Sequence, residues 1–147
     1  KDPENWTELK KQIDQRAPNK NHFLAFRFDA HFPSMKVRSV PRQQKPYPPL
    51  VDVVKEQAIF EHQDIVGTII GFRCPAYVKG INVPDYHAHF LSNDHKQGGH
   101  ILDFTSGSGP LQLDLCNQLL LVLTDRAEFS TLDLSQDRSH ELEKVEQ

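Results

Sequence analysis

Cysteine is scarce in this sequence, and the two that occur, Cys74 and Cys116, are too few for a disulfide framework. Long hydrophobic runs are absent as well. No stretch reaches about 18 consecutive apolar residues, which excludes a membrane-spanning helix. Positive charge is not in excess, because the formal net charge is -3. This balance argues against a general nucleic-acid binder and against a protein that binds anionic membranes.

What is present is ordinary globular composition, with 37% hydrophobic and 25% charged residues in 147. Such a chain forms one domain or a piece of a slightly larger one. Histidine is the exception, since its eight residues outnumber the seven glycines. The sequence begins at Lys1, without an initiator methionine or a signal-like segment. We therefore expect a fragment of a longer protein.

The amino-terminal residues predict a helix. Asp2 is a suitable N-cap, Pro3 suits the first helical position, and Pro18 disfavours helical geometry just before it. The apolar residues that recur at helical spacing are Trp6, Leu9 and Ile13. Two strands follow at 23–29 and 35–40, and the short link between them suggests a hairpin.

Residues 41–49 contain four prolines and cannot lie inside a sheet. This proline-rich connection is the best candidate for a boundary. We assign residues 1–49, a helix plus a β-hairpin and the connection, to the end of an amino-terminal subdomain. Residues 50–147 form a carboxy-terminal subdomain.

Strands dominate the second part. The expected elements are a helix at 50–57, strands at 65–72, 86–92, 100–104 and 111–115, a buried strand or short helix at 119–123, and a last helix capped by Ser135. The predicted fold class is therefore α+β, with a mixed or antiparallel β-sheet and flanking helices.

Three histidines stand out within this pattern. His87 and His89 are two positions apart on a predicted strand, so both side chains leave the same face. His100 opens the next strand, and a hairpin would bring it opposite that pair. Gly98 and Gly99 would relieve crowding before His100 and permit a positive φ there. Three converging imidazoles form a tetrahedral zinc site with one open position, as in catalytic sites, although Fe, Mn, Cu or Ni could also bind.

The remaining polar candidates are weaker. A single histidine on a strand is usually a packed core residue or a hydrogen-bonding surface residue and not a metal ligand. His95 falls in a turn, where we expect it to be exposed to solvent. Four other histidines show no spacing that links them to the site: His22, His31, His62 and His140. Arg38 lies on a predicted strand, where an arginine is usually solvated, but a guanidinium is also a natural partner for a substrate carboxylate.

Several blocks of the sequence closely resemble one known family, the α-acetolactate decarboxylases. The matching blocks, in the family's order and with compatible spacing, are 18–21, 38–43, 45–50, 67–72, 77–84, 87–91 and 98–104. The resemblance covers nearly the whole chain and implies an acetolactate decarboxylase-like fold with two subdomains. It also implies that residues 50–147 form the metal-binding subdomain.

The resemblance implies zinc-dependent decarboxylation of 2-acetolactate, a 2-hydroxy-3-keto acid, to acetoin, with the metal chelating the substrate hydroxyl and ketone. The residues that match the family's metal ligands are His87, His89 and His100. Arg38 matches its active-site arginine, and Glu146 best matches a glutamate near its carboxy terminus, with Glu143 as the alternative. A homodimer and a cytoplasmic, bacterial location are implied as well.

One departure from the family pattern concerns the start of the chain. The family has a further active-site glutamate in its amino-terminal part, before the segment that begins here. We expect the isolated chain to bind metal but to decarboxylate poorly.

Other classes of protein use similar histidines. A cupin-like oxygenase pairs His-x-His and a later histidine with a carboxylate ligand, for which Asp94 is the candidate here. A zinc ester hydrolase could use the same three imidazoles with a zinc-bound hydroxide. A binding module with purely structural zinc would need a fourth protein ligand that closes the site.

Overall fold

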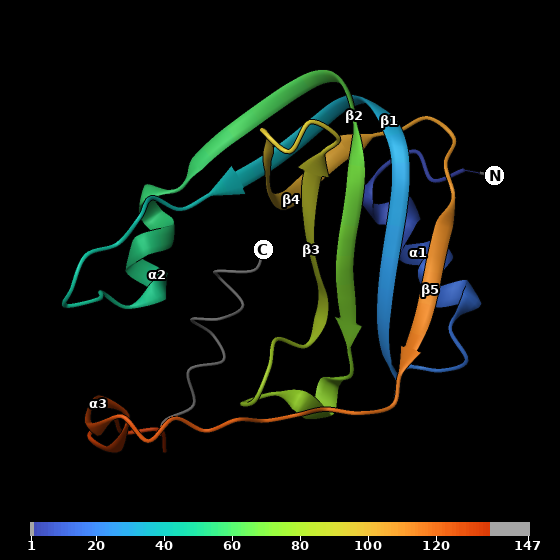
Figure 1. The fold of residues 1–147 in the computed structure, drawn as a ribbon. Helices are drawn as coiled ribbons and strands as arrows, with labels where there is room; N and C mark the ends of the chain where they lie inside the picture. The colour runs from blue at the N-terminus through green and yellow to red at the C-terminus, as the bar shows by residue number, and fades with distance from the viewer. Residues whose placement is uncertain (1, 136–147) are drawn as a thin grey trace.

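The computed structural model describes residues 2–135, which form a curved sheet of five strands with short helices around it (Figure 1). The elements in chain order are α1 (Trp6–Arg16), β1 (Phe23–Ser39), α2 (Leu50–Val53), a 3-10 turn (Val54–Glu56), β2 (Ala58–Cys74), a second 3-10 turn (Ala76–Val78), β3 (Asp85–Ser92), β4 (Gly98–Thr105), β5 (Leu111–Cys116) and α3 (Ala127–Ser130). No helix in this part of the chain is long and apolar enough to cross a membrane.

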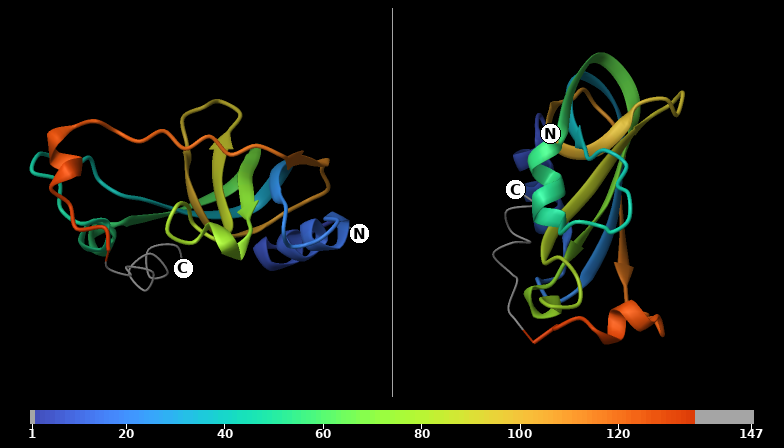
Figure 2. Two further views of the ribbon diagram at one scale, coloured as in Figure 1. Left: turned by 90° about the horizontal axis from the view of Figure 1, so that it is seen from below. Right: turned by 90° about the vertical axis from the view of Figure 1, so that its left-hand side faces the viewer.

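The sheet closes on itself because β1 pairs with both β2 and β4, the two strands that flank β3; β5 is a third neighbour of β1. It pairs with β2 along most of its length, with β5 through its first half and with β4 through its second half, while β3 joins β2 to β4. Every pairing is antiparallel, which confirms the predicted α+β class with an antiparallel sheet. Figure 2 shows α1 and α2 at opposite ends of this sheet.

The predicted hairpin between residues 29 and 35 is wrong, because β1 runs as one strand through Pro33. Its pairing with β2 is in the same register on both sides, with Phe32 opposite Ile65 and Ser34 opposite Gln63. Pro33 has no backbone N–H and so cannot donate a hydrogen bond to β2. Asp64 lies opposite Pro33 and has a positive φ of 54°. Both long strands bend along their length (Figure 1) and neither turns back on itself.

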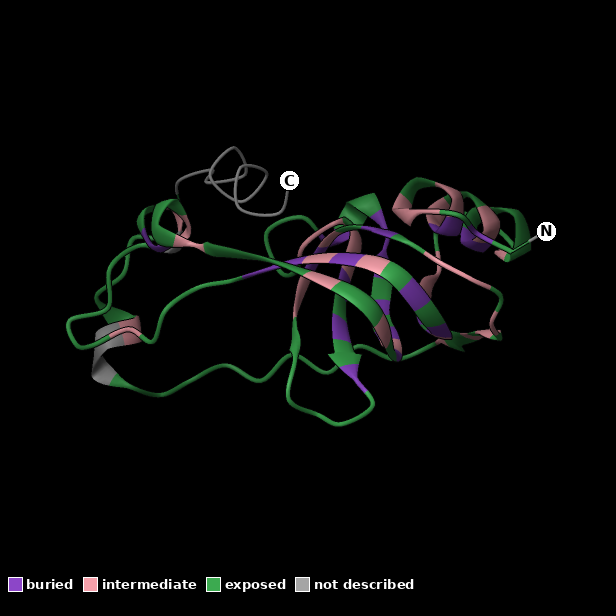
Figure 3. Cartoon of the chain, turned by 90° about the horizontal axis from the view of Figure 1, so that it is seen from above, coloured by how far each residue is buried: buried purple, intermediate pink, exposed green. Residues whose placement is uncertain are grey.

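An aromatic core fills the concave side of the sheet. Its largest fully buried side chains are Phe26, Phe28, Phe32, Leu9, Ile13, Leu24, Met35, Ile69 and Val37. The Phe32 ring meets the rings of Phe90 and Phe104 edge to face, at centroid distances of 5.5 Å and 5.4 Å. Buried and exposed residues alternate along the strands (Figure 3), as a half-buried sheet requires.

Helix α1 covers one end of this core with Leu9 and Ile13. It begins later than predicted, because the side chain of Asn5, not Asp2, caps it by accepting a hydrogen bond from the Glu8 backbone N–H at 2.9 Å. Pro3 is buried outside the helix. The helix ends at Arg16 with Ala17 as its C-cap, as the proline-containing boundary predicted.

A partly buried polar contact fastens α1 to the sheet. Arg73 of β2 donates from Nη1 to Asp14 Oδ1 at 2.8 Å, and the Tyr86 hydroxyl of β3 donates to the same oxygen at 2.8 Å. Arg73 is only 6% exposed, so losing the half-exposed Asp14 would leave a buried guanidinium without this partner, which is costly. The contact holds the start of β3, which carries two of the histidines, against the helix.

The proline-rich residues 41–49 form no strand, as predicted, and α2 with its 3-10 turn matches the helix expected at 50–57. Strands β1 and β2, on either side of this connection, belong to one sheet. The division into two subdomains at residue 49 stays a prediction about a longer protein.

The prediction of a buried strand or short helix at 119–123 is wrong. These residues form neither, and Leu120 and Val122 are 86% and 78% exposed, because the chain has left the sheet after β5 (Figure 1). An apolar run predicts burial only where other elements cover it. The last helix expected after Ser135 lies outside the described residues.

Candidate metal centre

Strand β3 separates two kinds of side chain. Ala88 and Phe90 face the aromatic core and are buried, whereas His87 and His89 leave the opposite face, as the two-residue spacing predicted. On β2, Ile70 is the Cα partner of His89 and is half exposed. The histidines therefore stand on the outer face of the sheet, beside apolar surface.

Strand β4 brings the third histidine to the same face. His100 is the direct Cα partner of His89 on β3 and of Arg38 on β1. The ladder between β1 and β4 shifts by one residue between Lys36 and Val37, so Leu102 is skipped. Such a β-bulge re-aims side chains next to it. With uninterrupted pairing, His100 would lie opposite Ser39 and leave the other face of the sheet.

The glycines before His100 allow the backbone of β4 to lie close to its neighbouring strands. Neither Gly98 nor Gly99 has a positive φ, so the conformational part of that expectation is wrong. The expected crowding is present, because a Cβ at Gly99 would lie 2.7 Å from the Arg38 carbonyl oxygen and 3.1 Å from Val37 Cβ. The absence of a side chain at Gly99 lets β4 pack tightly against β1.

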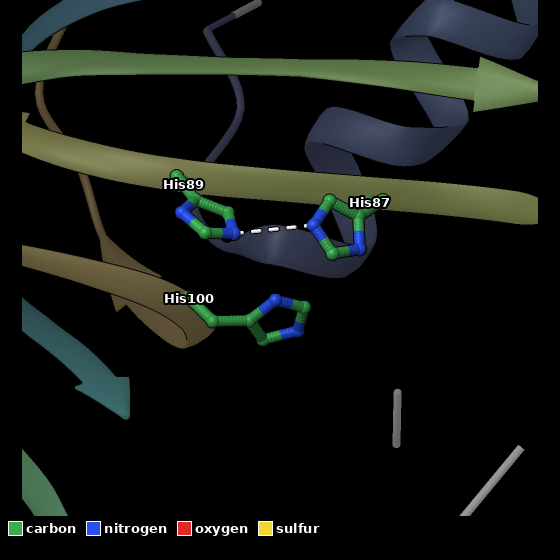
Figure 4. Close-up of side chains that lie close together, drawn as sticks. All are labelled: His87, His89 and His100. Carbon is green, nitrogen blue, oxygen red and sulfur yellow. Dashed lines mark hydrogen bonds between the residues drawn. The ribbon is translucent and has the colours of Figure 1, made fainter. Parts of the chain in front are cut away.

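The three imidazoles point toward one another (Figure 4), with one ligand-type nitrogen from each lying within 4.8 Å of the others. The Nε2 atoms of His87 and His89 are 3.1 Å apart. Two nitrogens that bind zinc at about 2.0–2.1 Å with a tetrahedral angle are roughly 3.3 Å apart. The cluster is therefore of the right size to hold one metal ion.

The electrostatics of the cluster suit a metal as well. The pKa of His100 is lowered from 6.5 to about 3, mostly by burial, with the positive charge of Arg38 and the neighbouring imidazoles acting in the same direction. His100 is therefore neutral at physiological pH. A neutral imidazole has a lone pair free for a metal ion, which a protonated one lacks.

Arg38 lies beside the histidines. It is only 7% exposed, and its Nη1 donates to Gln57 Oε1 at 3.1 Å. A buried guanidinium next to a histidine cluster that could hold a metal ion is suited to bind an anionic ligand. Sequence reasoning missed Gln57, whose place directly before a strand carries no signal of its contact with Arg38.

The remaining candidates lie elsewhere. Asp94 accepts hydrogen bonds from Ser92 Oγ at 2.6 Å and from the Lys96 backbone N–H at 3.1 Å in the turn after β3. Within residues 2–135, the cluster holds three histidines and no carboxylate or fourth ligand. That weakens the cupin-like and structural-zinc alternatives. Glu146 and Glu143 lie outside the described residues.

The other described histidines take part in different contacts. His31 meets Asp64 at 2.6 Å, His62 stacks on Phe60, and His22 contacts Asn19. His95 is exposed in the turn, as expected. Among the described residues, therefore, only three of the histidines come together in a cluster that could hold a metal ion.

The sequence matches one protein family over residues 1–136, that of alpha-acetolactate decarboxylase. A protein of that name from Methanosarcina mazei is 43% identical over 142 residues, which cover 97% of this chain and 49% of the relative. One from Methylococcus capsulatus is 39% identical over 99% of this chain and 56% of its own length. The chain thus spans about half the length of these relatives.

Solved structures show the same fold. The crystal structure of alpha-acetolactate decarboxylase from Bacillus subtilis strain 168 superimposes with a TM-score of 0.92 at 34% identity, over 99% of this chain and 63% of that one. A Staphylococcus aureus protein described as similar to alpha-acetolactate decarboxylase gives a TM-score of 0.87 at 26% identity. It too is matched over 63% of its length, by 98% of this chain.

Proposed function

Since this chain belongs to the α-acetolactate decarboxylase family, we propose that it carries the metal-binding part of an enzyme that converts 2-acetolactate to acetoin and CO₂. The observation that carries the proposal is the cluster of His87, His89 and His100 beside the buried Arg38. Three nitrogen donors and one cation on a single sheet face suit a substrate with a carboxylate and two adjacent oxygens.

Zinc is the metal that we propose. The donor set fits it, because three imidazoles with one open position are typical of catalytic zinc sites. Other divalent transition metals accept the same donors. When bound, zinc supplies Lewis-acid stabilisation of the negative charge that develops on the substrate ketone as CO₂ leaves.

Arg38 has the role of substrate positioning in this proposal. The guanidinium binds the substrate carboxylate, whose bond to the hydroxyl-bearing carbon then breaks. The electron pair of that bond moves toward the ketone, giving an enediolate. Because Arg38 is buried, its charge is screened less by water than an exposed arginine would be. It can hold the carboxylate and then balance the charge left on the product side.

The last step is protonation of the hydroxyl-bearing carbon, which completes acetoin. A carboxylic acid is the natural donor. We propose Glu146, with Glu143 as the alternative, for this role or for orienting water at the metal. The family's amino-terminal glutamate, which is not part of this sequence, is the other candidate donor.

The test is acetoin release from 2-acetolactate by the zinc-loaded chain of residues 1–147. We expect stoichiometric zinc by elemental analysis and slow but zinc-dependent acetoin formation, abolished in His89→Ala. Zinc binding with no acetoin above the rate in buffer, even when the preceding half of a relative is fused to the chain, would contradict the proposal. Near-normal turnover by the chain alone would contradict the expected need for that half. Parallel assays with an ester and with O₂ distinguish hydrolase and oxygenase chemistry.

A further inference from the structure

Gln57 occupies a fixed point next to the proposed site. It follows the 3-10 turn Val54–Glu56 directly and precedes the first residue of β2. Its backbone N–H donates to the Val54 carbonyl at 3.1 Å, which ends that turn. The next residue, Ala58, already pairs with Ser39 of β1. The backbone of Gln57 is therefore held on both sides.

From this point its side chain reaches Arg38. Gln57 Oε1 accepts a hydrogen bond from Arg38 Nη1 at 3.1 Å. An arginine side chain has several rotatable bonds, and ordering it costs up to about 2 kcal/mol of rotamer entropy. A hydrogen bond to one terminal nitrogen restricts the turning of the guanidinium plane. The opposite side of that plane can then face His100, the cross-strand partner of Arg38.

We propose that Gln57 is a positioning residue that aims the Arg38 guanidinium at the substrate carboxylate without offsetting its charge. The inference rests on the proposed function, because it assigns Arg38 to the carboxylate. It goes beyond that function by naming a residue that neither the histidine pattern nor the family blocks pointed to.

The chemistry of the acceptor supports this role. Two other arginines of the same sheet are held by carboxylates: Arg27 lies 2.8 Å from Asp29, and Arg73 lies 2.8 Å from Asp14. A carboxylate neutralises the cation that it holds. Gln57 provides an uncharged amide oxygen, so it orients Arg38 without itself neutralising the guanidinium charge.

The experiment measures two ligands of nearly equal shape on the zinc-loaded chain of residues 1–147. The probes are 2-hydroxyisobutyrate, which has a carboxylate, and 2-hydroxyisobutyramide, which is neutral. The variants are Gln57→Met, which keeps the length and removes the acceptor, and Gln57→Glu, which keeps the shape and adds a negative charge. Gln63→Glu is the matched control, because it makes the same charge change at an exposed position of β2.

We expect both Gln57 variants to weaken carboxylate binding about tenfold, and Gln57→Glu should bind the carboxylate less tightly than Gln57→Met. Zinc content and binding of the neutral amide should stay unchanged. Tenfold corresponds to about 1.4 kcal/mol. Gln63→Glu should bind both probes as the unchanged chain does. With 2-acetolactate, the Gln57 variants should raise KM more than they lower kcat.

Three results would overturn the inference. They are unaltered carboxylate binding in both variants, equal weakening of both probes, and no carboxylate binding by the unchanged chain. Equal weakening would indicate a purely structural role. Loss of selective carboxylate binding in the variants, together with no acetoin from the unchanged chain even when it is fused to the preceding half of a relative, would support Gln57 as an anchor for Arg38 and reject decarboxylation. The two proposals can therefore fail separately.

Discussion

Arg38 on β1 and His100 on β4 are direct cross-strand partners, so a guanidinium and an imidazole leave the same face of the sheet side by side. The one-residue shift that skips Leu102 makes them partners. Since side chains alternate along a strand, uninterrupted pairing would turn His100 to the opposite face of the sheet, away from Arg38. One extra residue in β4 thus decides that the histidine cluster and the arginine share a face.

Removing one histidine of the cluster should remove the metal. His89→Ala leaves two imidazoles, and we expect zinc affinity to fall by more than about 100-fold, since even second-shell partners of zinc ligands are worth roughly 10–100-fold. Elemental analysis after gel filtration measures this. His95→Asn is the control, because asparagine tolerates the positive φ of that turn residue. Stoichiometric zinc in His89→Ala would rule out His89 as a ligand.

Replacing the buried arginine should separate catalysis from metal binding. Arg38→Lys keeps a positive charge but loses the planar fork, so we expect unchanged zinc content and turnover reduced roughly 10–100-fold. That range corresponds to one charge-assisted hydrogen bond of about 1.5–3 kcal/mol. Acetoin release at saturating substrate measures the loss. Arg27→Lys, on the same strand and largely exposed, should have no such effect. Equal kinetics in Arg38→Lys would place Arg38 outside the site.

A methyl group at Gly99 should disturb the pairing that aligns Arg38 with His100. The added Cβ would lie 2.7 Å from the Arg38 carbonyl oxygen, which is backbone and cannot move away cheaply. We expect Gly99→Ala to lower the free energy of unfolding by about 1–3 kcal/mol and to weaken zinc binding.

Urea denaturation and zinc titration check that prediction. Gly107→Ala is the control, since the nearest atom to its added Cβ is 3.6 Å away, an ordinary contact. Unchanged stability and zinc affinity in Gly99→Ala would show that β4 can move away from β1 without loss.

The stability of the metal-free chain should fall in acid because of His100. In the folded chain burial lowers the pKa of this histidine from 6.5 to about 3. Between those values only the unfolded chain binds the proton, so acid favours unfolding across that window and this effect is absent above it.

Chemical denaturation of the zinc-free chain at several pH values measures this dependence. His100→Asn removes the titrating group, and its stability should fall less steeply between about pH 6.5 and pH 3. Identical pH slopes for the two chains would mean that His100 is already protonated when folded.

The sequence alone predicted much of this arrangement through local signals. Helix α1, strand β3 and the common face of His87 and His89 follow from residue spacing within one element. The close packing before His100 was expected from a pair of glycines. These features depend on neighbours along the chain, so a one-dimensional pattern contains them.

Other features depend on pairing between distant residues. The sequence of residues 29–35 predicts a hairpin, but the strand continues because β2 pairs with it on both sides of Pro33. The apolar residues 119–123 predict burial, but they are exposed because the chain has left the sheet. The contact of Gln57 with Arg38 joins two elements across a proline-rich connection.

Sequence by itself determined which residue types can bind a metal and which face of β3 they share, because the period of a strand is local. The sequence also predicted that His100 would lie opposite that pair, but only the tertiary structure decided that Arg38 joins them and that a register shift aligns it with His100. Strand register is set by the packing of whole strands against a core, and a single skipped residue, Leu102, reverses the face of everything beyond it.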